Sequence, residues 1–168
     1  MKITILYVSV TGNTETAAEY IEQGIKKADR KAAGLEVKLM NLVKEETLDP
    51  DYVKESKTVI IGTPTYVANM SWQMKKWFDT NREFKLAGKL GGVFATANFA
   101  HGGADLALLG LINHMLVKGM LIYSSGSGCG KPFIHLGPMA LKGELKHKKK
   151  LFMTFGRRMA DKTLELFG

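Results

Sequence analysis

Short runs of apolar residues alternate along the chain with longer segments in which apolar residues recur every three or four positions. The runs at 3–8, 59–61, 93–95 and 120–123 are nearly continuous, a pattern typical of strands that are buried on both faces. Residues 35–40 instead alternate apolar with charged side chains, which indicates a strand at the edge of a sheet. The pattern therefore predicts five short strands.

The segments between these strands show helical spacing. We expect a first helix to follow residue 14 and stop before Gly34, a second to begin after Ser71 as its cap, a third over 104–117 and a fourth over about 144–167. The apolar positions that define the first and last of these helices are Ala17, Ala18, Ile21, Ile25, Ala28 and Ala32, and Leu145, Phe152, Phe155, Met159 and Leu166. Strands that alternate with helices of this length imply crossover connections, and hence a parallel sheet with helices on both faces.

Nothing in the sequence divides the chain into separate units. Its 168 residues correspond to about one domain of typical size, and neither a repeat nor a linker interrupts the alternation. We therefore expect residues 1–168 to form a single α/β domain. The one long irregular segment, 124–141, is rich in Gly and Ser, and loops of that length are usually functional or mobile.

The loop after the first strand carries the densest cluster of candidate ligand groups. Ser9, Thr11 and Thr14 supply three hydroxyls, Asn13 supplies an amide, and Gly12 lets the backbone approach a ligand closely. This loop lies at the carboxyl end of a strand and at a helix N-terminus, where free N–H groups favour an anion. It contains no Lys or Arg and no Walker ending, so it suits one phosphate monoester rather than a nucleoside triphosphate. From these residues alone, a hydroxyl-rich helix cap without a ligand is the alternative.

The sequence Ser-Val-Thr-Gly-Asn-Thr at 9–14 resembles the phosphate loop of flavodoxins, which holds the phosphate of FMN. Two further segments, 64–70 and 93–103, resemble the flavin loops of the NAD(P)H:quinone oxidoreductases of the tryptophan-repressor-binding-protein type. The resemblance covers most of residues 1–123. It implies a flavodoxin-like three-layer sandwich, with a five-stranded parallel sheet of order 2-1-3-4-5 that binds one FMN.

The resemblance also implies which residues hold FMN, and it is imperfect in the second and third loops. Tyr66 stands where the family usually has Arg, Val67 where it has an aromatic residue, and Ala68 where it has Gly. We expect Tyr66 and Phe99 either to cover a face of the flavin ring or to pack into the neighbouring loop. The residues expected at the cofactor are Ser9, Thr11, Gly12, Asn13, Thr14, Pro64, Thr65, Tyr66, Val67, Ala68, Asn69, Thr96, Ala97, Asn98, Phe99, His101 and Gly102.

The family's activity implies hydride transfer from NAD(P)H to the flavin and then reduction of a quinone-like acceptor, with no side chain identified as a catalytic acid or base. The alternative is a flavodoxin-type electron carrier that docks on protein redox partners. In such carriers a peptide near the flavin can flip, and the pair Ala68-Asn69 could permit this because Asn tolerates positive φ. The helix at 104–117 is apolar nearly all round, and the family includes dimers and tetramers, so a homo-oligomer is also expected as an option.

Composition excludes several other classes of site and partner. A single cysteine, Cys129, rules out an internal disulfide and is expected to be an inert thiol. The four histidines lack metal-ligand spacing, so we expect no metal site, and for His101 a surface or core position is the alternative to a place beside the flavin.

The glycine-rich loop at 126–131 matches neither nucleotide-loop template, and we interpret it as a flexible loop near the flavin, with a lid as one option. The chain shows no targeting segment and no apolar stretch of membrane-spanning length, so we expect a cytoplasmic protein.

The net charge is +8, from 24 Lys and Arg against 16 Asp and Glu. Residues 142–158 hold seven of these cations and one carboxylate, a net +6. We expect these lysines to form a solvated outer face of the last helix, away from the three loops. No nucleic-acid-binding motif accompanies them, so nucleic acid is not an expected partner. Because flavodoxin-type carriers are often acidic, the charge favours the enzyme over the carrier.

Overall fold

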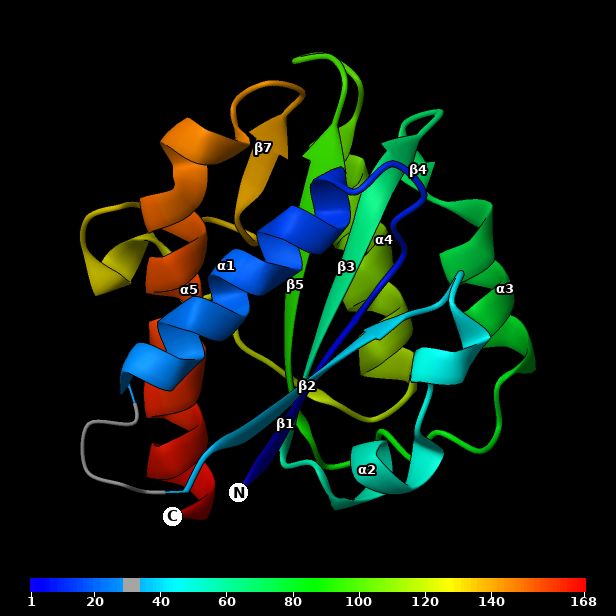
Figure 1. The fold of residues 1–168 in the computed structure, drawn as a ribbon, viewed down its shortest axis with the longest axis vertical. Helices are drawn as coiled ribbons and strands as arrows, with labels where there is room; N and C mark the ends of the chain where they lie inside the picture. The colour runs from blue at the N-terminus through cyan, green and yellow to red at the C-terminus, as the bar shows by residue number, and fades with distance from the viewer. Residues whose placement is uncertain (29–33) are drawn as a thin grey trace.

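The computed structural model describes residues 1–28 and 34–168 and contains the predicted alternation of strands and helices (Figure 1). The strands are β1 (Lys2–Tyr7), β2 (Glu36–Asn41), β3 (Thr58–Tyr66), β4 (Asn69–Met70), β5 (Leu90–Ala97), β6 (Leu121–Ile122) and β7 (Met139–Leu141). The helices are α1 (Asn13–Ala28), α2 (Pro50–Glu55), α3 (Trp72–Thr80), α4 (Ala104–Val117) and α5 (Leu145–Phe167), with short 3-10 turns η1 (Glu45–Thr47) and η2 (Ser127–Cys129). The predicted helical position Ala32 lies outside the described residues.

The central sheet is parallel and follows the order β2-β1-β3-β5-β6, so the predicted order 2-1-3-4-5 is confirmed for its five main strands. The predicted count of five is wrong, because the sheet has seven strands. β4 pairs antiparallel with β3, and β7 pairs parallel with the end of β5. The last main strand is short, so the chain leaves the sheet after Ile122 and returns at Met139 beside Ala95. Because β7 is short and forms only by pairing with the distant β5, the sequence pattern predicts an irregular segment over 124–141.

Two helical layers cover the sheet, with α1 and α5 on one face and α3 and α4 on the other (Figure 1). Alternate residues of β1 divide between the two layers: Ile3 and Ile5 pack under α1 and α5, and Leu6 packs with α3 and α4. The contact between α1 and α5 is close, since a Cβ at Gly156 would lie 2.1 Å from the carbonyl oxygen of Ile21. The predicted three-layer sandwich is confirmed.

The individual helices agree with most of the predicted boundaries. Ser71 caps α3 by accepting a hydrogen bond from the amide of Met74 at 3.5 Å, as its position predicts. The pattern missed α2, a six-residue helix that Asp49 caps by accepting from Tyr52 N at 2.9 Å. Leu166 was assigned wrongly to the apolar face of α5, because its side chain is 47% exposed near the end of the chain.

The outward face of α4 carries exposed apolar side chains at Leu106, Leu109, Leu116 and Val117, in agreement with its all-round apolar sequence. Whether these residues meet a second subunit stays a prediction. Among the described residues, no helix combines the length and the apolar character needed to cross a bilayer.

The segment after β6 is fastened to α5 by a buried arginine. The Arg158 guanidinium donates to Ser125 Oγ at 2.9 Å and to the carbonyl oxygens of Cys129 and Gly130 at 2.9 and 3.0 Å. It also donates to the carbonyls of Lys131 and Pro132, both at 3.3 Å. The glycine-rich loop at 126–131 is therefore held against α5, and the expectation of a lid beside the ligand loops is wrong.

Candidate functional site

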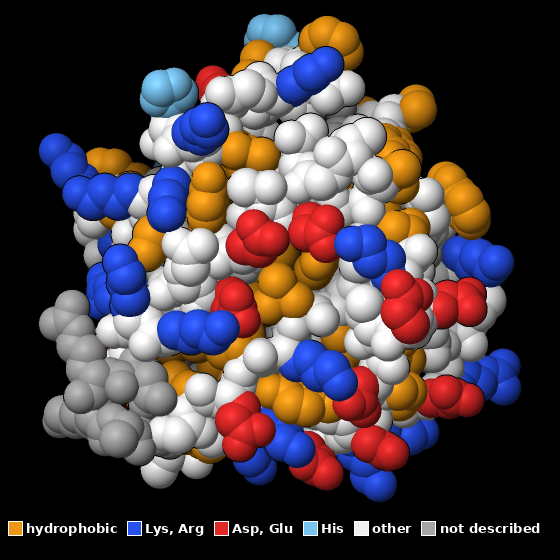
Figure 2. Space-filling model, viewed as in Figure 1, with side chains coloured by type: hydrophobic (Ala, Val, Ile, Leu, Met, Phe, Trp, Pro, Cys, Tyr) orange, Lys and Arg blue, Asp and Glu red, His pale blue; other side chains and the backbone are white. Residues whose placement is uncertain are grey.

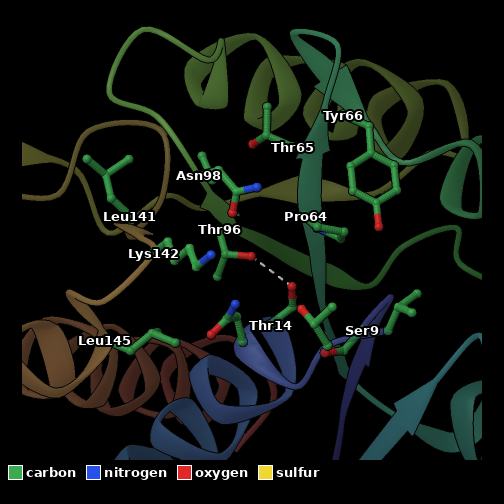
Figure 3. Close-up of a pocket in the computed structure, with 14 residues that line it drawn as sticks. Ser9, Thr14, Pro64, Thr65, Tyr66, Thr96, Asn98, Leu141, Lys142 and Leu145 are labelled. Atoms are coloured by element: carbon green, nitrogen blue, oxygen red, sulfur yellow. Dashed lines mark hydrogen bonds between the residues drawn. The ribbon is translucent and has the colours of Figure 1, made fainter.

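Three loops that leave the carboxyl ends of β1, β3 and β5 converge on one cleft of about 450 Å³ (Figure 3). This volume lies in the range of cofactor sites, and the place is the one at which open parallel sheets bind ligands. The residues that line the cleft are Ser9, Val10, Thr11, Asn13, Thr14, Pro64, Thr65, Tyr66, Thr96, Ala97, Asn98, Leu141, Lys142 and Leu145. Ten of the residues expected at the cofactor from sequence are thus brought together here.

The N-terminus of α1 forms one end of the cleft. Gly12 has φ +90°, a conformation that glycine adopts without strain, and its carbonyl accepts the first helical hydrogen bond from Thr16 N at 2.9 Å. The amides of Asn13 and Thr14 precede that bond and have no acceptor within the helix. Together with the Thr11 hydroxyl, they present donors and the positive end of the helix dipole to the cleft, which suits an anion.

Hydrogen bonds hold this loop in place from both sides. Thr14 Oγ1 and Thr96 Oγ1 are 2.8 Å apart and buried, so the first loop is tied to the end of β5. Asn41, at the end of β2, accepts from Ser9 N at 3.1 Å and donates to the Ser9 carbonyl at 2.9 Å. Sequence reasoning missed Asn41, although an amide at the carboxyl end of a neighbouring strand was an available signal.

A cation reaches the cleft from a distant part of the sequence. Lys142 follows β7, and its amide donates to the Ala97 carbonyl at 2.8 Å, which extends the pairing of β7 with β5. Its side chain extends into the cleft on the side of Thr96 in Figure 3, beside Leu141 and Leu145. The expectation of a cradle without cations is therefore wrong, and so is the expectation that the basic segment lies away from the loops. No local signal marked Lys142, because its position depends on β7.

The second loop is a tight β-hairpin with an unusual backbone. Tyr66 pairs with Asn69, and the two residues between them have positive φ, +49° at Val67 and +58° at Ala68. Positive φ at both central residues is the pattern of a type I′ turn, which normally holds Asn or Gly. The backbone at Val67 and Ala68 is therefore strained. Of the Ala68-Asn69 pair expected to permit a backbone flip, Ala68 has the positive φ, and Asn69 is a strand residue whose Oδ1 accepts from Met70 N at 2.8 Å.

A second cleft of about 360 Å³ continues from the first, since both are lined by Thr65, Tyr66, Ala97 and Asn98. Val67, Ala68, Phe99 and Gly102 complete its lining. The Tyr66 side chain is 39% exposed and that of Phe99 75% exposed, so neither ring is packed into the protein interior. The arrangement provides a polar end at α1 and an apolar, aromatic end at the hairpin.

The residues present fit FMN. Its phosphate matches the donors at α1 and Lys142, and its flat ring matches the aromatic end of the joined clefts. The Thr65 hydroxyl is buried beside both clefts without a hydrogen-bond partner among the described residues, which is the state of a group that a polar ligand satisfies. When bound, FMN supplies the redox chemistry, and these side chains hold and orient it.

Three residues expected at the cofactor line neither cleft. Gly12 shapes the loop, Asn69 lies in β4, and His101 is exposed. Within the described ranges, no three His, Cys, Asp or Glu side chains form a group that would bind a metal ion. Cys129 is exposed, with its Sγ 3.5 Å from the Tyr123 hydroxyl, and lies outside both clefts.

One titratable group at the end of β1 is strongly perturbed. Burial, followed by the charge of Glu15, raises the pKa of Tyr7 well above its usual value. The Tyr7 hydroxyl donates to Glu15 Oε1 at 3.2 Å, and Lys44 Nζ donates to the same oxygen at 2.9 Å. This network ties the first turn of α1 to Tyr7 and Lys44, and the raised pKa keeps Tyr7 neutral.

Known proteins with similar sequences and folds match this chain over most of its length. A flavodoxin from Clostridium saccharobutylicum is 47% identical over 99% of this chain and 100% of its own length. An NAD(P)H dehydrogenase (quinone) from Chromohalobacter salexigens is 30% identical over 76% of this chain and 73% of its own length. The crystal structure of a flavodoxin, WrbA-like protein from Agrobacterium tumefaciens superposes with a TM-score of 0.76 at 23% identity, over 98% of both chains, and supports the fold.

The family model described as NADPH-dependent FMN reductase matches residues 1–128, which include all three ligand loops. The resemblance recognised from the loop motifs is thereby confirmed. The chain belongs to the NADPH-dependent FMN reductase family of flavodoxin-like flavoproteins, whose cofactor is FMN.

Proposed function

We propose that residues 1–168 form one FMN-binding domain that passes electrons from NAD(P)H through FMN to a quinone-like acceptor. The observation that carries this proposal is the pair of joined clefts at the carboxyl ends of β1, β3 and β5. One end offers the α1 amides and Lys142 to a phosphate, and the other offers an open space beside two exposed aromatic rings. The relatives named NAD(P)H dehydrogenase (quinone) support the choice of electron donor and acceptor.

In this proposal the protein binds, orients and limits access, and the flavin carries the electrons. The α1 amides, the Thr11 hydroxyl and Lys142 fix the phosphate end. The buried Thr65 hydroxyl lies where it can bond a polar edge of the ring. Tyr66 and Phe99 rim the second cleft, where nicotinamide and acceptor rings would stack against the flavin in turn.

A flavodoxin-type electron carrier is the second candidate function. The observation that favours it is the full-length match to the Clostridium saccharobutylicum flavodoxin, which has essentially the same chain length. The longer quinone dehydrogenase relatives contain residues that this chain does not match. Both candidates use the same FMN site and differ in what reduces and oxidises it.

Flavin loading and steady-state kinetics test the two candidates in sequence. The purified protein is first titrated with FMN and with riboflavin, following flavin fluorescence. Failure to bind either flavin contradicts both candidates. The FMN-loaded protein is then mixed with NADH or NADPH, with and without a benzoquinone. Rapid quinone-dependent oxidation of NAD(P)H supports the enzyme, whereas flavin that NAD(P)H does not reduce, but dithionite does, supports the carrier.

A further inference from the structure

The positive charge of the chain is concentrated on one side of the molecule. In Figure 2, Lys and Arg side chains gather on the left edge, over α5 in the orientation of Figure 1, and most Asp and Glu side chains lie over the centre and right. We call this surface the basic face and define it by Lys27, Lys131, Lys146, Lys148, Lys150 and Arg157. All six of these residues are exposed.

Two grooves run along the basic face, one on each side of α5. The first, of about 480 Å³, lies between α1 and α5, and Lys27, Lys146 and Arg157 line it. The second, of about 570 Å³, lies between α5 and the segment 131–133 and is lined by Lys131, Lys148 and the exposed ring of Phe133. The described side chains that line the two grooves include no carboxylate.

The cations of the basic face are nearly all uncompensated. Elsewhere on the described surface, some lysines pair with carboxylates, as Lys38 does with Asp49 at 2.5 Å and Lys75 with Asp79 at 2.6 Å, and others, such as Lys76, form no ion pair. On the basic face, Arg157 forms the one ion pair seen in the described part of the chain, with Asp161 at 3.0 Å. Like charges held this close repel one another, and an anionic partner relieves that repulsion.

The basic face adjoins the FMN cleft at the end that suits the phosphate. Lys142 and Leu145 line the cleft, and α5 begins at Leu145 and carries Lys146, Lys148 and Lys150 in its first two turns. From Lys146 to Arg157 the cations extend for roughly 16 Å along the helix. This span exceeds that of a single small anion and suits the small, polar interfaces of transient electron-transfer complexes, which bury less than about 1,200 Å² in total.

We propose that the basic face is a docking surface for an acidic redox protein, which would exchange electrons with FMN from the phosphate end of the cleft, at Lys142 and Leu145. The inference rests on the FMN site of the proposed function and not on the reaction with NAD(P)H. A reduced, acidic iron–sulfur protein donates one electron in each encounter. Two encounters, together with two protons from solvent, would therefore reduce FMN completely. Charge complementarity of this kind raises association rates and is weakened by salt.

Binding of an acidic [2Fe–2S] ferredoxin, carrying a fluorescent label, tests the docking surface by anisotropy. The face variant is K146E/K148E/K150E, and the control variant K76E/R82E/K85E makes the same change in net charge on α3 and the loop after it. None of the six residues lines the FMN cleft. Each protein is measured with and without FMN, at about 20 mM and about 300 mM salt.

We expect the face variant to bind ferredoxin at least about tenfold more weakly than the wild type at low salt, and the control variant to lose less than about threefold. At about 300 mM salt, the difference in ferredoxin affinity between the face variant and the wild type should disappear. Equal losses in the two variants, or no ferredoxin binding by the wild type, overturn the proposal. The proposal is also overturned if duplex DNA or phosphatidylserine vesicles bind through this face more tightly than ferredoxin does. The experiment measures binding and includes the protein without FMN. Its outcome therefore does not depend on whether NAD(P)H reduces the flavin.

Discussion

Gly103 makes room for Ala68. A Cβ built on Gly103 would lie 2.6 Å from both Cα and Cβ of Ala68, closer than real Cβ atoms approach other atoms. Gly103 also caps α4 with φ +81° and ψ +31°, in the left-handed region that glycine adopts at little cost. The start of α4 therefore packs directly against the strained turn between β3 and β4, and this contact positions one wall of the second cleft.

Replacing Gly103 by alanine should distort that wall. The new side chain meets both an unfavourable φ and the Ala68 backbone, so we expect G103A to lower the free energy of unfolding by about 2–4 kcal/mol. It should also weaken FMN binding. Urea unfolding of the protein without FMN, and titration with FMN, measure the two effects.

Gly128→Ala is the matched control for that change. Gly128 has no positive φ and no atom within 4 Å of the position of a Cβ, so we expect G128A to stay within about 0.5 kcal/mol of the wild type. If G103A were as stable as G128A, the tight contact between α4 and the turn would be refuted.

The turn itself stores strain that substitution can relieve. Val67 is 101% exposed, so replacing it removes no buried apolar surface. We expect V67N/A68G, which supplies the residues preferred at positive φ in a type I′ turn, to raise the free energy of unfolding by about 1–2 kcal/mol. Urea unfolding without FMN measures this gain. An unchanged or lower stability would show that the positive φ values carry no strain.

The two ends of the site should respond differently to loss of the phosphate ligands. Thr11→Val removes a hydroxyl at the α1 end, and Lys142→Gln removes the cation from β7. We expect each to weaken FMN binding by about tenfold and riboflavin binding by less than about twofold, because riboflavin lacks the phosphate. Fluorescence titrations with both flavins give the comparison.

Lys146→Gln is the control for Lys142→Gln, since Lys146 is one turn further along and outside the cleft. It should leave both affinities within about twofold of the wild type. Equal losses of FMN and riboflavin in the Thr11 or Lys142 variant would contradict the assignment of this end to the phosphate.

The contrast between the first loop and Lys142 shows what sequence patterns can and cannot provide. Residues 9–14 are contiguous, and the strand before them and the helix after them are strongly patterned, so their geometry follows from local rules. Lys142 enters the cleft only because β7 returns to pair with β5 across a long intervening segment. Local patterns do not encode such a non-local pairing.

The hairpin of the second loop escaped prediction for a different reason. Valine and alanine rarely occupy positive φ, so the residues at 67 and 68 argue locally against the turn that they form. Pairing of Tyr66 with Asn69, together with the packing of α4, overrides this preference. Places where tertiary structure forces an unfavoured local conformation are concentrated at functional sites.

Tyr52 should make the protein sensitive to alkaline pH. Its hydroxyl is buried without a partner among the described residues, and burial, with the charges of Glu36 and Asp49, raises its pKa to about 12. The unfolded chain ionises near pH 10, so the folded state holds this proton more tightly, and the resulting stability is complete below about pH 10 and lost between about pH 10 and 12. The Y52F variant keeps the ring, which lies 5.5 Å from Lys38 Nζ, and we expect it to be at least as stable as the wild type at pH 7. Between pH 9 and 11, its free energy of unfolding should fall by about 1 kcal/mol less than that of the wild type. Urea unfolding at each pH measures this, and parallel losses in the two proteins would refute it.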